Sequence, residues 1–124
     1  MILGLGIDQC DVRRVQSRLE TDPGFAASLF LPAEIAYCTS KRHPAEHFAA
    51  RFAAKEAVVK ALAKAADRGT FWLDIEITHE PGGQPRPVLS GRLGELATGL
   101  GVRSIHVSLT HTADMAAAVA IAEG

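Results

Sequence analysis

The segment 45–66 constrains the fold more than any other, because it is a long helical sequence with few polar positions. At about 100° per residue, its large apolar side chains fall on one stripe, and alanines fill most other directions. The stripe consists of Phe48, Phe52, Val59, Leu62 and Ala66. A helix that is apolar nearly all round is usually buried nearly all round. We therefore predict a central helix from about Ala45 to Ala66.

Charged residues within this helix need partners, because an unpaired buried charge is very costly. Lys55 projects from the middle of the stripe, and Glu56 lies on its flank. Glu56 and Lys60 are four apart in the favourable order, a pair worth about 0.3–0.5 kcal/mol when exposed. That pair would leave Arg51 and Lys55 unexplained, since like charges four apart repel. An anionic ligand that contacts both cations would explain them.

The remaining segments indicate an α+β fold with a small antiparallel sheet, one long helix and several short ones. Alternating apolar residues predict strands, and proline or capping residues predict helix starts. The predicted strands are the opening run to Asp8, residues 71–78 with Phe71, Leu73, Ile75 and Ile77 inward, 88–89, and a terminal hairpin at 105–122 with its bend at 111–114. The predicted short helices begin at Asp11, Leu31 and Arg92.

Asp8 is a second candidate for chemistry, because it shares a strand face with Gly4 and Gly6, where a large group could approach the backbone. Its carboxylate could simply cap the following turn. Alternatively it could bind a hard cation, since Mg²⁺ is typically held by one or two carboxylates together with phosphate oxygens and water. Glu56 would then be the second carboxylate.

The terminal hairpin carries the third cluster, consisting of His106, Ser108, Thr110 and His111. It could be a solvated hairpin or a face that holds phosphate oxygens. No cysteine or acidic residue stands at zinc-like spacing, so we predict no zinc site.

Length and charge limit the class of protein. The chain has 124 residues, which suits one domain over 1–124 with a thin core that self-association could complete. Its 13 basic and 14 acidic residues argue against a general nucleic-acid or membrane-surface binder. No apolar run reaches the ~20 residues that span a bilayer. We expect a cytoplasmic protein in which Cys10 and Cys38 are reduced thiols.

Three motifs occur together in this order, and together they resemble the holo-acyl-carrier-protein synthase family of the phosphopantetheinyl transferases. They are residues 4–8 (GLGID), 51–57 (RFAAKEA) with Lys60-Ala61, and 106–111 (HVSLTH). The similarity runs from end to end, including Phe71, residues 74–76 and the turn at 83–85.

The resemblance implies transfer of phosphopantetheine from coenzyme A to a serine of an apo acyl carrier protein, with release of 3′,5′-adenosine bisphosphate and with fatty-acid biosynthesis as the associated pathway. It implies a Mg²⁺ or Mn²⁺ requirement and a homotrimer whose active sites are shared between subunits. The larger sets of implied residues are these: Asp8 and Glu56 for the metal; Arg51, Lys55, Lys60, Ser108 and His111 for coenzyme A; Glu56, Lys60 and His111 for catalysis; and Arg13, Arg14 and Arg18, on the outer face of the first helix, for docking the carrier protein.

The sequence departs from this family in the stretch 63–69, which lacks the usual glycines, and at Gln9, where an aliphatic residue is common. Two other functions remain open. A non-catalytic module that binds coenzyme A would need the cations but not both carboxylates. A metal-dependent phosphohydrolase would need a site that positions water, and no further carboxylate cluster is evident for a second metal.

Overall fold

The computed structural model describes residues 1–63 and 71–124 and confirms the α+β class. Its strands are β1 (Ile2–Asp11), β2 (Ile75–His79), β3 (Pro85–Leu89), β4 (Ser104–His111) and β5 (Met115–Glu123). Its helices are α1 (Val12–Thr21), α2 (Phe25–Leu29), α3 (Pro32–Thr39), α4 (Pro44–Leu62) and α5 (Gly91–Gly99), with a 3₁₀ turn, η2, at Trp72–Asp74.

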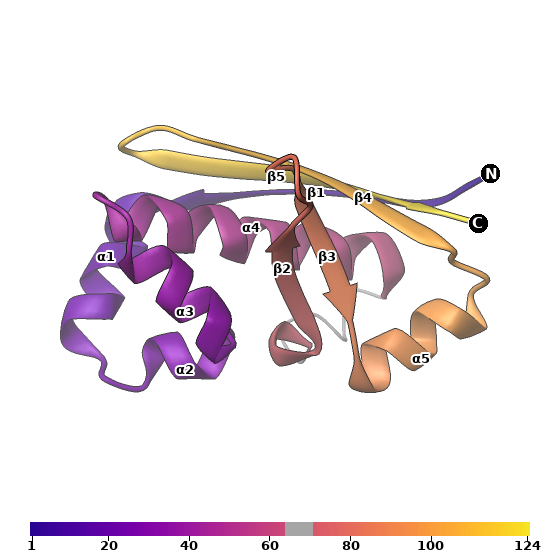
Figure 1. Cartoon of the computed structure of the whole chain (residues 1–124), viewed down its shortest axis with the longest axis horizontal. Coiled ribbons are helices and arrows are strands. Elements are labelled where there is room, and N and C mark those ends of the chain that lie inside the picture. Colours follow the sequence, from indigo (N-terminus) through magenta and orange to yellow (C-terminus); the bar gives the residue numbers. More distant parts are fainter. Residues whose placement is uncertain (64–70) are drawn as a thin grey trace.

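Helix α4 lies at the centre of the molecule, as its apolar sequence predicts. An antiparallel sheet in the order β1-β5-β4 covers one side of α4, and α1 to α3 with the β2–β3 hairpin lie on the other side (Figure 1). Core residues on two sides of the helix, such as Phe48 and Val58, are therefore almost completely buried.

Two glycines set how closely β1 approaches α4. A Cβ atom at Gly4 would collide with the carbonyl of Ala61, and one at Gly6 with the carbonyl of Ala57. The bare strand face is therefore filled by the protein's own helix, and not by a ligand. Asp8 has the same parity as the glycines and so points toward the α4 side.

The opposite face of the same strand is apolar and exposed. Leu5 is 65% exposed and Ile7 is 68% exposed, with Leu3 beside them. Single exposed apolar residues are ordinary, but a row of them on one sheet face marks a surface that another chain could cover.

Two predictions need correction, and one helix was missed. Helix α4 ends at Leu62, since Ala63 is already extended, and the alanine-rich sequence gives no local signal for this end. Leu73 is 45% exposed and not inward, because η2 replaces the start of the predicted strand and Asp74 turns to accept the N–H of Leu93. Helix α2 was not predicted. The departure in stretch 63–69 lies, after Ala63, outside the described residues.

The terminal hairpin forms as predicted, with His106 opposite Ile121 and Ser108 opposite Val119. Cys10 and Cys38 are both free thiols, as expected. Within residues 1–63 and 71–124, no helix is both long and apolar enough to cross a bilayer.

Candidate active site

The Asp8 carboxylate is held at the edge of α4 by a lysine. The Lys60 ammonium donates to Asp8 Oδ1 at 2.8 Å and to the carbonyl of Ile7 at 2.8 Å. The two side chains keep exposed fractions of 17% for Asp8 and 28% for Lys60, so solvent and solutes reach the pair. The capping role considered for Asp8 belongs to Asp11, whose side chain accepts the N–H of Arg13 at 2.9 Å.

Glu56 lies one helical turn before Lys60 and is buried, with 7% of its surface exposed. The indole N–H of Trp72 donates to Glu56 Oε1 at 2.6 Å. Since Lys60 directs its ammonium to β1, α4 uses these two residues to contact different elements, and not as the intrahelical pair that their spacing suggests.

The Cys10 thiol has the same strand parity as Asp8. Its pKa is raised to about 11, first by burial and then by the charges of Asp8, Asp11 and Glu56, while Arg14 opposes them. The contact that links the two candidate carboxylates is that of Asp8 on β1 with Lys60 on α4, one helical turn after Glu56.

These residues suit a hard cation. Both candidates supply carboxylate oxygens, and Asp8 already has a positive group, the Lys60 ammonium, against it. In the described parts of the chain, no cluster of three or more histidine, cysteine, aspartate or glutamate side chains could hold a metal by itself. A cation between Asp8 and Glu56 would thus need further oxygens from a substrate or from water.

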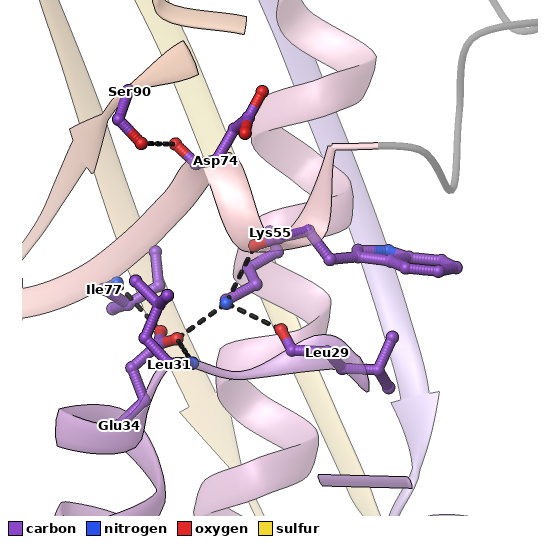
Figure 2. Close-up of polar contacts among 8 residues, drawn as sticks. Leu29, Leu31, Glu34, Lys55, Asp74, Ile77 and Ser90 are labelled. Carbon is purple, nitrogen blue, oxygen red and sulfur yellow. Dashed lines mark hydrogen bonds and ion pairs between the residues drawn. The ribbon is translucent and has the colours of Figure 1, made fainter. Parts of the chain in front are cut away.

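Lys55 has a different position from the one expected for a phosphate ligand. Its ammonium is completely buried and donates to Glu34 Oε1 at 2.7 Å, to the carbonyl of Leu29 at 2.8 Å and to that of Trp72 at 3.0 Å (Figure 2). An ammonium has three N–H donors, and these three acceptors use them all. This geometry does not support a contact between Lys55 and coenzyme A.

Glu34 completes this buried network. Its Oε1 also accepts the N–H of Leu31 at 2.8 Å, and its Oε2 accepts the N–H of Ile77 at 3.0 Å (Figure 2). The pair thus joins the start of α3, the middle of α4 and strand β2. Sequence reasoning missed Glu34, although a lysine in the middle of an apolar stripe signals that a buried acid must exist somewhere in the chain.

Arg51 is also buried, with 4% of its surface exposed. Its Nη2 lies 3.1 Å from His79 Nε2, and its guanidinium lies 4.0 Å above the Tyr37 ring. Burial and then the charges of Arg51 and Lys41 lower the pKa of His79, which keeps its ring a neutral acceptor. Within the described residues the Arg51 Nε has no hydrogen-bond partner, so this guanidinium is only partly satisfied.

The hairpin residues separate into two groups. His111 Nδ1 lies 3.0 Å from Glu46 Oε1, and its ring is 5.0 Å from that of His47, so His111 faces the N-terminal end of α4. Ser108 is exposed on the sheet face opposite α4, on the same side as His106, which pairs with Glu123 at 3.0 Å. The fold of one chain does not bring Ser108 to Glu56.

The arginines of α1 are on the surface, as predicted. Arg13 pairs with Asp114 at 3.0 Å and Arg18 with Asp22 at 3.1 Å, and pairs this exposed contribute little to stability. Arg14 is exposed as well, and its charge reaches the Cys10 thiol. The basic helix follows directly on β1, the strand that carries Asp8.

A model of the 4′-phosphopantetheinyl transferase superfamily matches residues 4–120. The chain belongs to this superfamily. The match confirms the resemblance found in the sequence and identifies the chain as a transferase of the holo-acyl-carrier-protein synthase type.

Individual members of the superfamily agree over nearly the whole chain. A holo-[acyl-carrier-protein] synthase of Koribacter versatilis is 46% identical over 124 residues, covering 99% of each chain. The crystal structure of the Neisseria meningitidis synthase has a TM-score of 0.88 and 26% identity, and covers 100% of both chains. The Helicobacter pylori synthase, solved in complex with coenzyme A, has a TM-score of 0.78 and 29% identity, covering 96% of this chain and 99% of that one.

Proposed function

We propose that the protein transfers the 4′-phosphopantetheine group from coenzyme A to a serine of an apo acyl carrier protein and releases 3′,5′-adenosine bisphosphate. The observation that carries the proposal is the 2.8 Å contact between the Lys60 ammonium and Asp8, which joins β1 to α4 one helical turn after Glu56. A relative of the same fold is solved with coenzyme A, and the relatives are synthases of holo carrier protein.

In this proposal Asp8 and Glu56 would hold Mg²⁺ or Mn²⁺, which would supply positive charge against the diphosphate of coenzyme A. The serine oxygen of the carrier forms a bond to the phosphorus that bears the pantetheine, and the bond from that phosphorus to the bridging oxygen breaks. Glu56 accepts the serine proton, directly or through water. Lys60 donates to the phosphate oxygens, where negative charge accumulates.

Arg51 and His111 are the proposed contacts for the rest of coenzyme A, and His111 stays a catalytic candidate. The incompletely satisfied guanidinium of Arg51 supports its part, because a buried donor without a partner is costly unless a ligand satisfies it. Lys55 is left out of this set because its donors are already used.

The proposed assembly is a homotrimer whose sites are shared between subunits. The exposed row of Leu3, Leu5 and Ile7 supports self-association. Ser108 lies on the same outer face of the sheet, so its proposed contact with coenzyme A would be made in a neighbour's site. A cytoplasmic location and a role in fatty-acid biosynthesis complete the proposal.

Mass spectrometry of an apo carrier protein tests the proposal. Incubation with this protein, coenzyme A and Mg²⁺ should add one phosphopantetheine group to one serine. Asp8→Asn and Glu56→Gln should each abolish the addition, whereas Glu95→Gln, the same change on exposed α5, should not. Coenzyme A binding without any mass gain would favour the non-catalytic module, and cleavage of coenzyme A with an unmodified carrier would favour the phosphohydrolase.

A further inference from the structure

We propose that Trp72 is a positioning residue for Glu56, and that the buried Lys55–Glu34 pair fixes Trp72 in place. The inference rests on the proposed role of Glu56 and adds the residue that orients its carboxylate.

The contact between the indole and the carboxylate is short and directed. The Trp72 Nε1–H donates to Glu56 Oε1 at 2.6 Å. The indole has one donor and no acceptor, so this bond orients the carboxylate without offering it an alternative proton donor or acceptor. A hydrogen bond to a charged oxygen is also about twice as strong as a neutral one.

The tryptophan itself is held from two sides. Its ring packs against Phe52, with 6.0 Å between centroids. Its carbonyl accepts from the Lys55 ammonium at 3.0 Å, and that ammonium is fixed by Glu34 and by the carbonyl of Leu29. Figure 2 shows how these contacts enclose the Lys55 ammonium between α4 and the segment from Leu29 to Glu34.

A continuous set of contacts thus runs from Glu34 through Lys55 and Trp72 to Glu56. Lys55 and Glu56 are adjacent on α4, so one faces the buried network and the other faces the site. A hydrogen bond to a metal ligand from a residue that does not itself touch the metal orients that ligand. Its removal typically costs about 10–100-fold in metal affinity or activity. This gives the buried pair a consequence for catalysis although it touches no substrate.

Trp72→Phe tests the proposal, because it keeps an aromatic ring and removes the N–H. We expect kcat to fall. We also expect the affinity for Mg²⁺ to weaken, as measured by calorimetry in the presence of coenzyme A. The two losses together should be about 10–100-fold. The KM for the carrier protein should not change. The free energy of unfolding should change little, because the variant keeps a ring that can pack on Phe52. A merely structural role would instead lower stability and leave Mg²⁺ affinity unchanged, and that result would overturn the inference.

A second measurement needs no change at position 72. Trp72 is the single tryptophan of the chain, so tryptophan fluorescence reports on the surroundings of this side chain alone. Addition of Mg²⁺ and coenzyme A to the wild-type protein should shift the emission, and Glu56→Gln should remove the shift, whereas Glu95→Gln should keep it. An unchanged shift in Glu56→Gln would contradict the coupling of Trp72 to Glu56.

The two proposals fail in different ways. A wild-type protein that adds no phosphopantetheine to the carrier would overturn the proposed function and this inference with it. A wild-type protein that does so, with a Trp72→Phe variant of equal kcat and equal Mg²⁺ affinity, would overturn this inference alone.

Discussion

Helix α4 contributes a lysine to each of two ion pairs, and the pairs differ in their access to water. Lys55 and Glu34 are 0% and 1% exposed, whereas Lys60 and Asp8 are 28% and 17% exposed. The first pair is closed, with all three ammonium donors used inside the protein. The second lies at the edge of β1, where a solute can compete for the same carboxylate.

This difference separates a scaffold from a site. Burial lowers the pKa of Lys55, while the hydrogen bond and the charge of Glu34 raise it. Lys55 therefore depends on Glu34 to remain charged. Moving two charges out of water is costly, and only good geometry offsets that cost. The open pair of Lys60 and Asp8 loses less hydration. A phosphate or a metal ion can therefore replace one of its members at a small cost in free energy.

Removal of the closed lysine should have the largest effect. Lys55→Met leaves the Glu34 carboxylate buried without its counter-charge, which typically costs about 3–5 kcal/mol. Urea denaturation followed by circular dichroism would measure the free energy of unfolding. The double variant Glu34→Gln/Lys55→Met leaves no uncompensated charge and should recover part of the loss. A change under about 1 kcal/mol in Lys55→Met would contradict the closed-pair interpretation.

The same substitution at the open lysine should act on turnover and not on folding. Lys60→Met removes a partly exposed pair, so the free energy of unfolding should change by about 1 kcal/mol at most. It also removes the donor that we propose for the reacting phosphate, and loss of one such donor typically costs about 10²–10³ in kcat. Steady-state transfer to the carrier protein measures it. A stability loss like that of Lys55→Met, with kcat intact, would show that the two pairs play the same part.

The sequence predicted the positions of these lysines better than their roles. Apolar periodicity predicted the long helix and its burial correctly, apart from its C-terminal end, because that signal is spread over many residues. The role of Lys55 depended on Glu34, which is 21 positions away, and no local pattern encodes that contact. Asp8 and Glu56 could be named as candidates from residue type, but the contact of Asp8 with Lys60, one turn after Glu56, depends on how β1 packs on α4. The inward position predicted for Leu73 was wrong for a related reason, since the neighbouring Asp74 side chain accepts the N–H of Leu93 in α5.

The exposed arginines of α1 extend the comparison to a third set of cations. Arg14→Glu should raise the KM for an acidic carrier protein about tenfold, because reversal of an exposed charge weakens electrostatic steering. Rising salt should reduce the difference between variant and wild type. Arg92→Glu, on α5 at the far end of the molecule from α1 (Figure 1), is the matched control and should leave the KM unchanged. Equal effects of the two variants would argue against α1 as the docking face.

The smallest expected effect on stability concerns Arg51. Its side chain is buried like that of Lys55, but within the described residues its Nε has no hydrogen-bond partner. Its acceptor His79 has a pKa below the ordinary 6.5, through burial first and then the charges of Arg51 and Lys41. The unfolded chain therefore binds more protons than the folded one between that lowered pKa and 6.5. This part of the stability is complete above the ordinary value and is lost as the pH falls through the window.

His79→Gln should reduce this dependence on pH, because a glutamine oxygen can still accept from Arg51 and does not titrate. The free energy of unfolding, measured at neutral pH and again at mildly acidic pH, should fall less in the variant than in the wild type. Burial also lowers the pKa of His47, together with the charges of His111, Arg51 and Lys41, so the variant should keep part of the dependence. His43→Gln, at the exposed start of α4, is the control. An identical pH dependence in His79→Gln and wild type would mean that the Arg51 guanidinium tolerates a charged neighbour, and that it is less tightly enclosed than Lys55.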